Sequence, residues 1–267
     1  MYISTIERDT ASTSMPASRK APEKWTKERA EAVLNDTDSC WFSSLSSAVK
    51  RRLVERGRII NLRRNALLCR AEDAPEGIYA VLEGDVRAYL KGENGEAVFY
   101  RSLGPGAWNG ITPILNRNAR RMTTLRAHSQ AVVLFVPRAE LEAIAADRDG
   151  LAALVDLLCI INNETARLAL DGRSDATVRT ARAVLRLVKA HGQRTGDFAE
   201  LDIRLSQADL ASLVGVSRQY MNELIARWEK DALMQWRSSG RHRVNWRELC
   251  AMLNPADRDW FEAPGWA

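Results

Sequence analysis

The sequence predicts an α+β protein, in which a β-rich N-terminal half is followed by a long helix and a small C-terminal domain. Three observations support this prediction. Short apolar strands separated by turn signals fill residues 58–136. Helical periodicity begins near residue 139, and a compact pattern of two short helices lies within 205–244. A chain of 267 residues is long enough for two ordinary domains.

The first 25 residues are polar, and we expect a disordered tail there because they carry no apolar periodicity. Helices are predicted at Trp25–Val33 and Ser44–Glu55. The chain is 46% apolar and 27% charged, which is typical of a globular protein. No apolar run reaches the roughly 18 residues that span a bilayer, and the first 30 residues lack the apolar core of a signal peptide. We therefore expect a cytoplasmic protein without a membrane partner.

The β-rich region carries regular turn signals. Asn94-Gly95 is the strongest short hairpin signal, and Gly104-Pro105-Gly106 marks another turn. Many short strands with such turns predict a jelly-roll β-domain over residues 26–147. Its strands are expected at Arg58–Leu62, Ala66–Arg70, Ile78–Leu82, Val86–Lys91, Ala97–Leu103, Arg121–Ala127 and Ala131–Val136.

A long helix is predicted within residues 148–172, which we interpret as a dimerisation helix and hinge. Its apolar positions step by four and three residues, the spacing of a coiled-coil seam. The alternative is a helix packed on its own β-domain. We expect this helix to end at Asp171-Gly172, and another helix is predicted at Asp175–Ala190. The seam consists of Leu154, Leu158, Ile161, Thr165 and Leu168.

The most informative stretch begins at Ser206, which stands where a helix cap is expected, three residues before Asp209. Gly215 supplies a tight turn that requires a positive φ. Ser217 caps a second helix, which extends to about Lys230. These offsets define a helix-turn-helix. A helical hairpin without a DNA role is the alternative.

A basic hairpin is expected directly after the second helix. Met234–Arg237 and Arg243–Trp246 can pair across residues 238–240, which would give a wing. Residues 204–247 contain eight basic and four acidic residues, as expected for contact with a polyanion. We predict a winged helix-turn-helix domain over 173–255, followed by a C-terminal tail over 256–267.

The second helix is expected to enter the major groove of double-stranded DNA with its N-terminal turns forward. Arg218 is suited to guanine and Gln219 to adenine. Ser217, at the helix N-terminus, is suited to a phosphate. The expected contacts to DNA are Ser206, Gln207, Ser217, Arg218, Gln219, Tyr220 and Asn222, with Arg241, Arg243 and His242 of the wing on the backbone.

A β-roll, a long helix and a C-terminal winged helix-turn-helix, in this order, resemble the Crp/Fnr family of bacterial regulators over about residues 40–250. The resemblance is strongest over residues 205–222. Residues 76–88 are similar to the early strands of a cyclic-nucleotide-binding domain, and residues 103–110 to the segment before its phosphate cassette. The resemblance implies a dimer, an effector pocket in the β-roll, and control of a promoter with RNA polymerase as a partner.

The resemblance assigns the effector positions to Gly110, Ile111, Arg121, Met122, Glu164 and Thr165. Members that bind cAMP have Glu where this chain has Ile111, and Ser where it has Met122. An apolar Ile cannot hydrogen-bond a ribose. We therefore expect an effector other than cAMP, or none.

Other site chemistry is not indicated. Four separated cysteines (Cys40, Cys69, Cys159 and Cys250) and three isolated histidines show no metal-binding spacing, so we expect no metal and no cofactor. Because no catalytic constellation is apparent, an enzyme is not expected. The alternative function is a ligand-sensing β-roll that works through protein partners without binding DNA.

Overall fold

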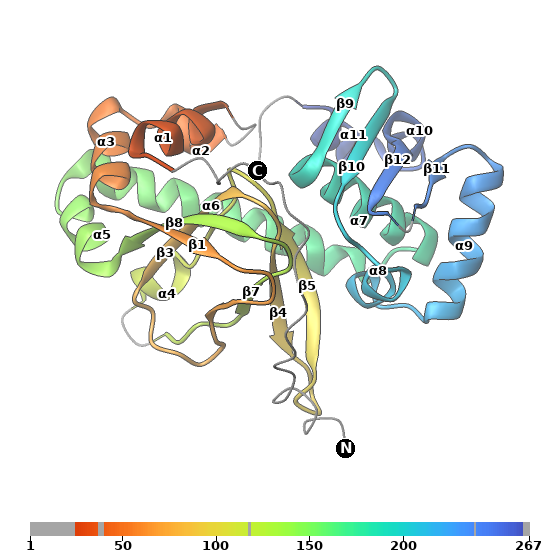
Figure 1. Ribbon diagram of the computed structural model, residues 1–267, viewed down its shortest axis with the longest axis horizontal. Coiled ribbons are helices and arrows are strands. Elements are labelled where there is room, and N and C mark those ends of the chain that lie inside the picture. Colours follow the sequence, from red (N-terminus) through yellow and green to blue (C-terminus); the bar gives the residue numbers. More distant parts are fainter. Residues whose placement is uncertain (1–24, 37–39, 117–118, 238, 264–267) are drawn as a thin grey trace, which may run out of the picture.

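The computed structural model describes residues 25–36, 40–116, 119–237 and 239–263. The predicted N-terminal tail therefore lies almost entirely outside the described residues. The predicted α+β architecture is confirmed. A β-roll with helices at one end lies beside a smaller mixed domain, and one long helix runs from the first to the second (Figure 1).

Two antiparallel four-stranded sheets make up the β-roll in the described residues, with orders β1-β8-β3-β6 and β2-β7-β4-β5. Successive residues of β3 and β8 point to opposite faces of the sheet, and both sets are buried, in two different apolar cores. Both strands are therefore covered on both faces. The strands are β1 (Arg58–Leu62), β2 (Leu67–Cys69), β3 (Gly77–Glu83), β4 (Val86–Lys91), β5 (Ala97–Leu103), β6 (Trp108–Asn109), β7 (Thr124–Ala127) and β8 (Ala131–Pro137). All seven predicted strands are present, and the short β6 was not predicted.

Helices close one face of the first sheet. Trp41 and Trp108 pack edge to face with ring centroids 4.9 Å apart, in a core that α1, α2 and α3 share with α5. The predicted helix Ser44–Glu55 is divided, because Ser46 caps a new helix there. These helices are α1 (Lys27–Asp36), α2 (Cys40–Ser44), α3 (Ser47–Arg56), α4 (Thr112–Leu115) and α5 (Arg138–Ala145).

The long helix α6 spans Arg148–Asp171. The predicted seam begins inside the chain's own core, because Leu154 is 1% exposed there and Leu158 and Ile161 pack against the same cluster. The alternative interpretation, a helix packed on its own β-domain, therefore holds for this part of α6. The large apolar side chains that α6 exposes are Leu151, which lies one heptad before Leu158, and Val155 and Leu170.

The second domain surrounds α7 (Ala176–His191), whose apolar face is buried in its core. Its sheet has the order β11-β12-β10-β9. The hairpin of β9 and β10 was not predicted from the sequence, and neither was α11, in which Phe261 is buried where a tail was expected. The other elements are β9 (Gly192–Thr195), β10 (Phe198–Asp202), α8 (Gln207–Val214), α9 (Arg218–Lys230), β11 (Met234–Gln235), β12 (Arg241–Asn245), α10 (Trp246–Ala251) and α11 (Pro255–Glu262).

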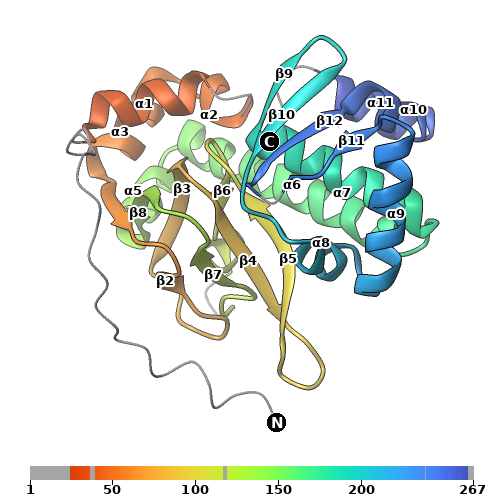
Figure 2. The same ribbon diagram turned by 45° about the vertical axis from the view of Figure 1, so that its right-hand side comes forward.

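The two domains are in direct contact. α8 lies beside β5 in both views of the chain (Figures 1 and 2). Phe99 of β5 belongs to the core of the second domain, and Tyr89 of β4 packs against that core. Gly104 approaches α7 so closely that a Cβ there would lie 1.9 Å from the carbonyl oxygen of Ala190. This close approach explains why glycine occupies the position.

Candidate nucleic-acid interface

The turn between α8 and α9 has the geometry of a helix-turn-helix. Gly215 has φ +74° and donates its N–H to the carbonyl oxygen of Ala211. A Cβ at Gly215 would meet no atom within 4 Å, so crowding does not explain the glycine. The left-handed backbone conformation explains it. Ala211 is 3% exposed and belongs to the domain core. The predicted turn is thus formed by the residues that the sequence indicated.

Both helices begin with a side-chain cap. The Ser206 hydroxyl accepts from the Asp209 N–H at 3.0 Å, and the Asp209 carboxylate accepts from the Ser206 N–H at 3.0 Å, which completes a capping box. Ser217 accepts from the Tyr220 N–H at 3.1 Å. These caps fix where α8 and α9 begin and therefore which side chains α9 exposes.

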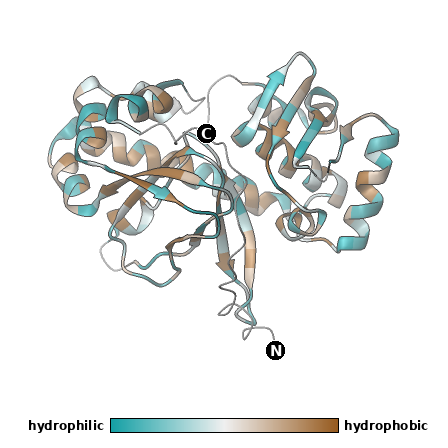
Figure 3. Cartoon of the chain, viewed as in Figure 1, coloured by the Kyte–Doolittle hydropathy of each residue, from teal (hydrophilic) through white to brown (hydrophobic). Residues whose placement is uncertain are grey.

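α9 has one buried and one exposed face. Its buried residues are Met221, Leu224, Ile225 and Trp228. Arg218, Gln219 and Asn222 are exposed together near its beginning, which is coloured hydrophilic in Figure 3. Gln219 donates to the Glu223 carboxylate at 3.2 Å, so the exposed row carries both signs of charge.

Tyr220 differs from the expectation of an outward side chain. It is half-buried, and its hydroxyl hydrogen-bonds the Thr177 hydroxyl of α7 at 3.1 Å. Because a phenol ring packed on α7 cannot also point into a groove, Tyr220 positions α9 on the domain. Ser206 is exposed and Gln207 half-buried at the beginning of α8.

The wing is formed by β11 and β12, with Met234 opposite Val244 and Gln235 opposite Arg243. Arg241 is exposed, and Arg243 is half-buried with its guanidinium 4.0 Å from the Phe198 ring centroid. The nearest carboxylates to these two guanidiniums, Asp202 and Glu200, lie at 3.9 Å, so the pairings are loose.

His242 was expected to contact the DNA backbone, and that expectation is wrong. It is 0% exposed, stacks on Trp236 and accepts from the Arg237 N–H at 3.2 Å. Burial lowers the pKa of His242. A neutral imidazole therefore supports the wing from inside.

The six residues assigned to an effector do not form one pocket. Gly110 and Arg121 are neighbours, but Arg121 is 4% exposed and already donates to the Gly77 carbonyl oxygen at 2.8 Å. Ile111 lies in the apolar core at 1% exposure, whereas Met122 is 72% exposed.

The two effector positions expected on the long helix, Glu164 and Thr165, contact other partners. Glu164 forms an ion pair with Arg101 of β5 at 2.5 Å. Thr165 is exposed and donates to the carbonyl oxygen of Ile161 in its own helix. Neither side chain therefore completes a site around Arg121.

A buried polar network that sequence reasoning missed joins the domains. Arg87 of β4 is 1% exposed, and it contacts Asp85 at 3.1 Å, Asp209 of α8 at 3.3 Å and the carbonyl oxygen of Arg204 at 2.6 Å. Strand alternation predicts a solvent-facing Arg87 in an isolated sheet. Because α8 covers that face, the charge is buried instead.

The same network reaches α7 through a serine and a histidine. The Ser102 hydroxyl donates to Asp85 at 2.6 Å and lies 2.7 Å from Nε2 of His191. Burial lowers the pKa of His191, and Asp85, 3.9 Å from the ring, opposes that shift.

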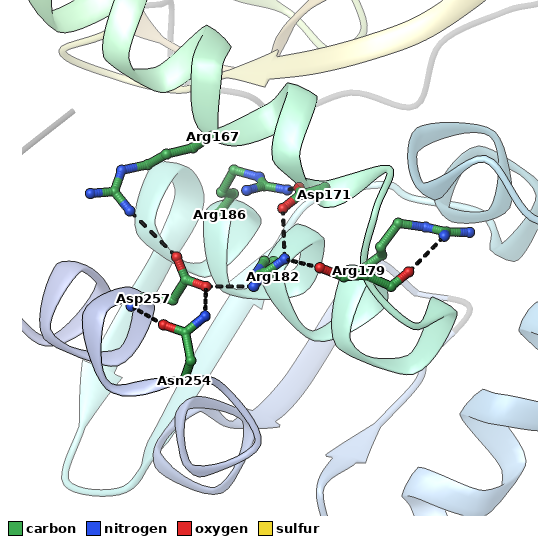
Figure 4. Close-up of polar contacts among 8 residues, drawn as sticks. Arg167, Asp171, Arg179, Arg182, Arg186, Asn254 and Asp257 are labelled. Carbon is green, nitrogen blue, oxygen red and sulfur yellow. Dashed lines mark hydrogen bonds and ion pairs between the residues drawn. The ribbon is translucent and has the colours of Figure 1, made fainter.

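A second network fixes the hinge between α6 and α7 (Figure 4). Asp171 at the end of α6 accepts from Arg182 and Arg186 of α7. Asp257 of α11 contacts Arg182 at 2.5 Å and Arg167 of α6 at 3.4 Å. The three helices are therefore cross-linked by charge at the point where the domains join.

Metal and membrane features are not found in the part of the chain that the structure describes. No group of three or more potential metal ligands gathers there. No described helix has the length and apolar character needed to cross a bilayer.

Comparisons with known proteins agree with this geometry. A model of the cyclic nucleotide-binding domain family matches residues 59–148, and a model of the Crp-like helix-turn-helix domain matches residues 178–252. A search of curated proteins finds no match.

Several solved structures share the fold. FixK2 from Bradyrhizobium japonicum has a TM-score of 0.62 at 16% identity, over 74% of this chain and 98% of that one. The c-di-GMP-responsive regulator CLP of Xanthomonas campestris has 0.58 at 19%, over 75% and 99%. A CRP/FNR-family transcriptional regulator from Thermus thermophilus has 0.56 at 18%, over 73% and 97%. With both domain types present in the family's order, this chain belongs to the Crp/Fnr family of DNA-binding transcription regulators, which are not enzymes.

Proposed function

We propose that the protein regulates transcription as a homodimer that reads a roughly palindromic operator with α9. The observation that carries this proposal is the exposed group of Arg218, Gln219 and Asn222 at the beginning of a helix whose opposite face is buried. Side chains at this end of a recognition helix contact base edges in the major groove. Arg218 would bind guanine and Gln219 adenine.

The phosphate contacts would come from both sides of that helix. Ser217 and the first N–H groups of α9 suit one phosphate, and Ser206 and Gln207 at the beginning of α8 suit another. Arg241 and Arg243 extend the basic surface along the wing. We assign no base contact to Tyr220, since its hydroxyl is bonded to Thr177.

The dimer contact proposed here uses the exposed face of α6. Leu151, Val155 and Leu170 are 45%, 42% and 59% exposed, so this helix carries large apolar side chains that a dimer contact would cover. A two-fold axis along α6 would place the two α9 helices for half-sites about one DNA turn apart. We therefore propose residues 148–172 as the dimerisation helix and hinge, between a β-roll over 26–147 and a DNA-binding domain that begins at residue 173 and includes α11.

The β-roll cassette is proposed not to bind cAMP. Ile111 is committed to the core, and the Arg121 guanidinium is occupied by the Gly77 carbonyl oxygen and lies over the Tyr79 ring. Calorimetry with cAMP should therefore give no saturable heat, and micromolar binding would contradict the proposal. A cytoplasmic location and contact with RNA polymerase accompany the proposed role.

The test is selection of bound DNA from a random pool by the full-length protein, with and without a panel of cyclic nucleotides. We expect a symmetric consensus. Arg218→Ala should lose discrimination mainly at one base pair per half-site, by about 1–3 kcal/mol. Arg227→Ala, on an exposed arginine farther along α9, is the control. Recovery of no DNA would favour a ligand-sensing module without DNA binding, and an equal loss on every sequence would remove Arg218 from base reading.

A further inference from the structure

A cavity of about 520 Å³ lies between the β-roll and the DNA-binding domain. It is bounded by β5, the end of α6, α7, the end of α8, and Trp260 of α11. This volume falls within the roughly 300–1,000 Å³ of small-molecule sites. The six effector positions expected from the sequence lie elsewhere, apart from Glu164. The cavity is therefore a separate place for a ligand.

Much of the cavity wall is apolar. Phe99, Leu168, Leu187, Leu213 and Trp260 all line it, and they come from five different elements. A wall of this kind releases water when an apolar body enters, and it contributes affinity in proportion to the area covered. The occupant therefore has an aromatic or aliphatic body.

The polar part of the wall is mainly cationic. Arg101, Arg179, Arg186 and Lys189 line the cavity together with two carboxylates, Glu164 and Asp171. Both carboxylates are already engaged, Glu164 by Arg101 and Asp171 by Arg186 and Arg182. The hinge network beside the cavity joins three guanidiniums to two carboxylates (Figure 4). Positive charge is thus in excess on this wall.

Arg179 supplies the cation that a ligand can neutralise. Its guanidinium donates to the carbonyl oxygen of Ser174 at 3.0 Å, and no carboxylate of the described residues forms an ion pair with it. It is half-buried on the face of α7 that carries Ala183 and Arg186, where the field is less screened than in bulk water. An arginine in such a place binds a carboxylate or sulfonate well.

We propose that this interdomain cavity binds a small organic anion, with an oxyanion head on Arg179 and an apolar body against Leu213 and Trp260. Because β5, the hinge and α8 all contribute to the wall, the ligand binds only while the domains are docked. By linkage it then stabilises the docked arrangement. The ligand site stands on the cavity alone, whereas an effect on operator binding rests on the proposed function.

The test uses two fluorescent probes with the same aromatic body. 8-Anilinonaphthalene-1-sulfonate carries the anionic head, and N-phenyl-1-naphthylamine lacks it. We expect the sulfonate to bind the full-length protein saturably at one molecule per chain, and the neutral probe to bind at least about tenfold more weakly, a difference of about 1.4 kcal/mol. Equal affinities, or no saturable binding of the sulfonate, would overturn the proposal.

Three variants locate the site. Arg179→Gln should weaken the sulfonate about tenfold and leave the neutral probe unchanged. Ser212→Trp, at an exposed cavity residue, should exclude both probes by filling the space. Arg173→Gln removes an exposed arginine that does not line the cavity and should change neither affinity. Sulfonate binding that survives both Arg179→Gln and Ser212→Trp would place the probe elsewhere and refute the site.

DNA binding is measured separately, by gel shift with the selected operator. Probe binding as described without any operator binding would refute the proposed function and support the site. Operator binding without probe binding would refute the ligand site and support the proposed function.

Discussion

Replacement of Arg87 by methionine removes the buried cation that joins the β-roll to the DNA-binding domain. In the native chain this guanidinium contacts Asp85, Asp209 and the carbonyl oxygen of Arg204, and it lies over the Phe99 ring at 4.8 Å. Methionine keeps most of the length of the side chain and its contact with the ring. The substitution therefore removes the charge while it largely preserves the packing.

The magnitude follows from the burial of each partner. Arg87 and Asp85 have side chains 1% and 5% exposed, and removal of one partner from such a pair costs about 3–5 kcal/mol. Asp209 is 36% exposed, so its lost pairing adds less than about 1 kcal/mol after solvent screening. Asp85 keeps the Ser102 hydroxyl, which moderates the loss. We expect Arg87→Met to lower the free energy of unfolding by about 3 kcal/mol.

The assay is guanidinium unfolding of the full-length protein, followed by tryptophan fluorescence and by far-ultraviolet circular dichroism. Coupled domains unfold together, and loss of the network should separate the transitions reported by the two probes. Arg126→Met is the matched control, because Arg126 lies opposite Arg87 on β7 and donates to an exposed carbonyl oxygen of Asn65. The control should cost less than about 1 kcal/mol.

A double variant checks the cause of the loss. Asp85→Asn combined with Arg87→Met removes both charges, so it should be more stable than Arg87→Met alone. The reasoning is refuted if Arg87→Met is no less stable than Arg126→Met, or if its transitions remain coincident.

Three further predictions concern other contacts. Gly104→Ala should destabilise the protein by about 1–3 kcal/mol, because the new Cβ would lie 1.9 Å from the Ala190 carbonyl oxygen. Gly172→Ala is the control and should be neutral in the same denaturation assay, since its Cβ would lie 3.6 Å from the nearest atom. Burial lowers the pKa of His191 in the folded chain, so below about pH 6.5 the unfolded chain binds a proton that the folded chain does not, and the free energy of unfolding falls as the pH drops. His191→Gln should therefore flatten the dependence of stability on pH between about pH 7 and 5.5. An unchanged dependence would contradict the burial argument. Arg243→Ala should weaken all DNA sequences alike and reduce the salt slope by about one, as measured by fluorescence anisotropy, and a sequence-dependent loss would count against a phosphate role.

Short-range signals made the DNA-binding half predictable. Ser206, Gly215 and Ser217 act through hydrogen bonds and dihedral angles within a few residues of themselves, so their roles follow from the local sequence. Strand positions were equally readable, since β1, β4 and β5 begin and end where turn residues and alternation indicated.

Elements with weaker local patterns were missed. β9 and β10 form a partly polar hairpin whose inward residues, such as Ala199 and Leu201, are few. α11 looks polar in sequence, and its burial depends on Phe261 and on ion pairs of Asp257 with distant helices. Neither signal is visible within a short window of sequence.

The sequence by itself determined the α+β architecture, the helix-turn-helix and the family, because caps, turns and apolar periods are local properties. Only the tertiary structure decided which face of each element is covered. It placed Leu154 in the chain's own core, engaged Arg121 with a carbonyl oxygen, buried Arg87 beneath α8, and enclosed the cavity beside Arg179. Burial and charge pairing depend on segments far apart in the chain, and strand or helix periodicity alone does not specify what packs against a face.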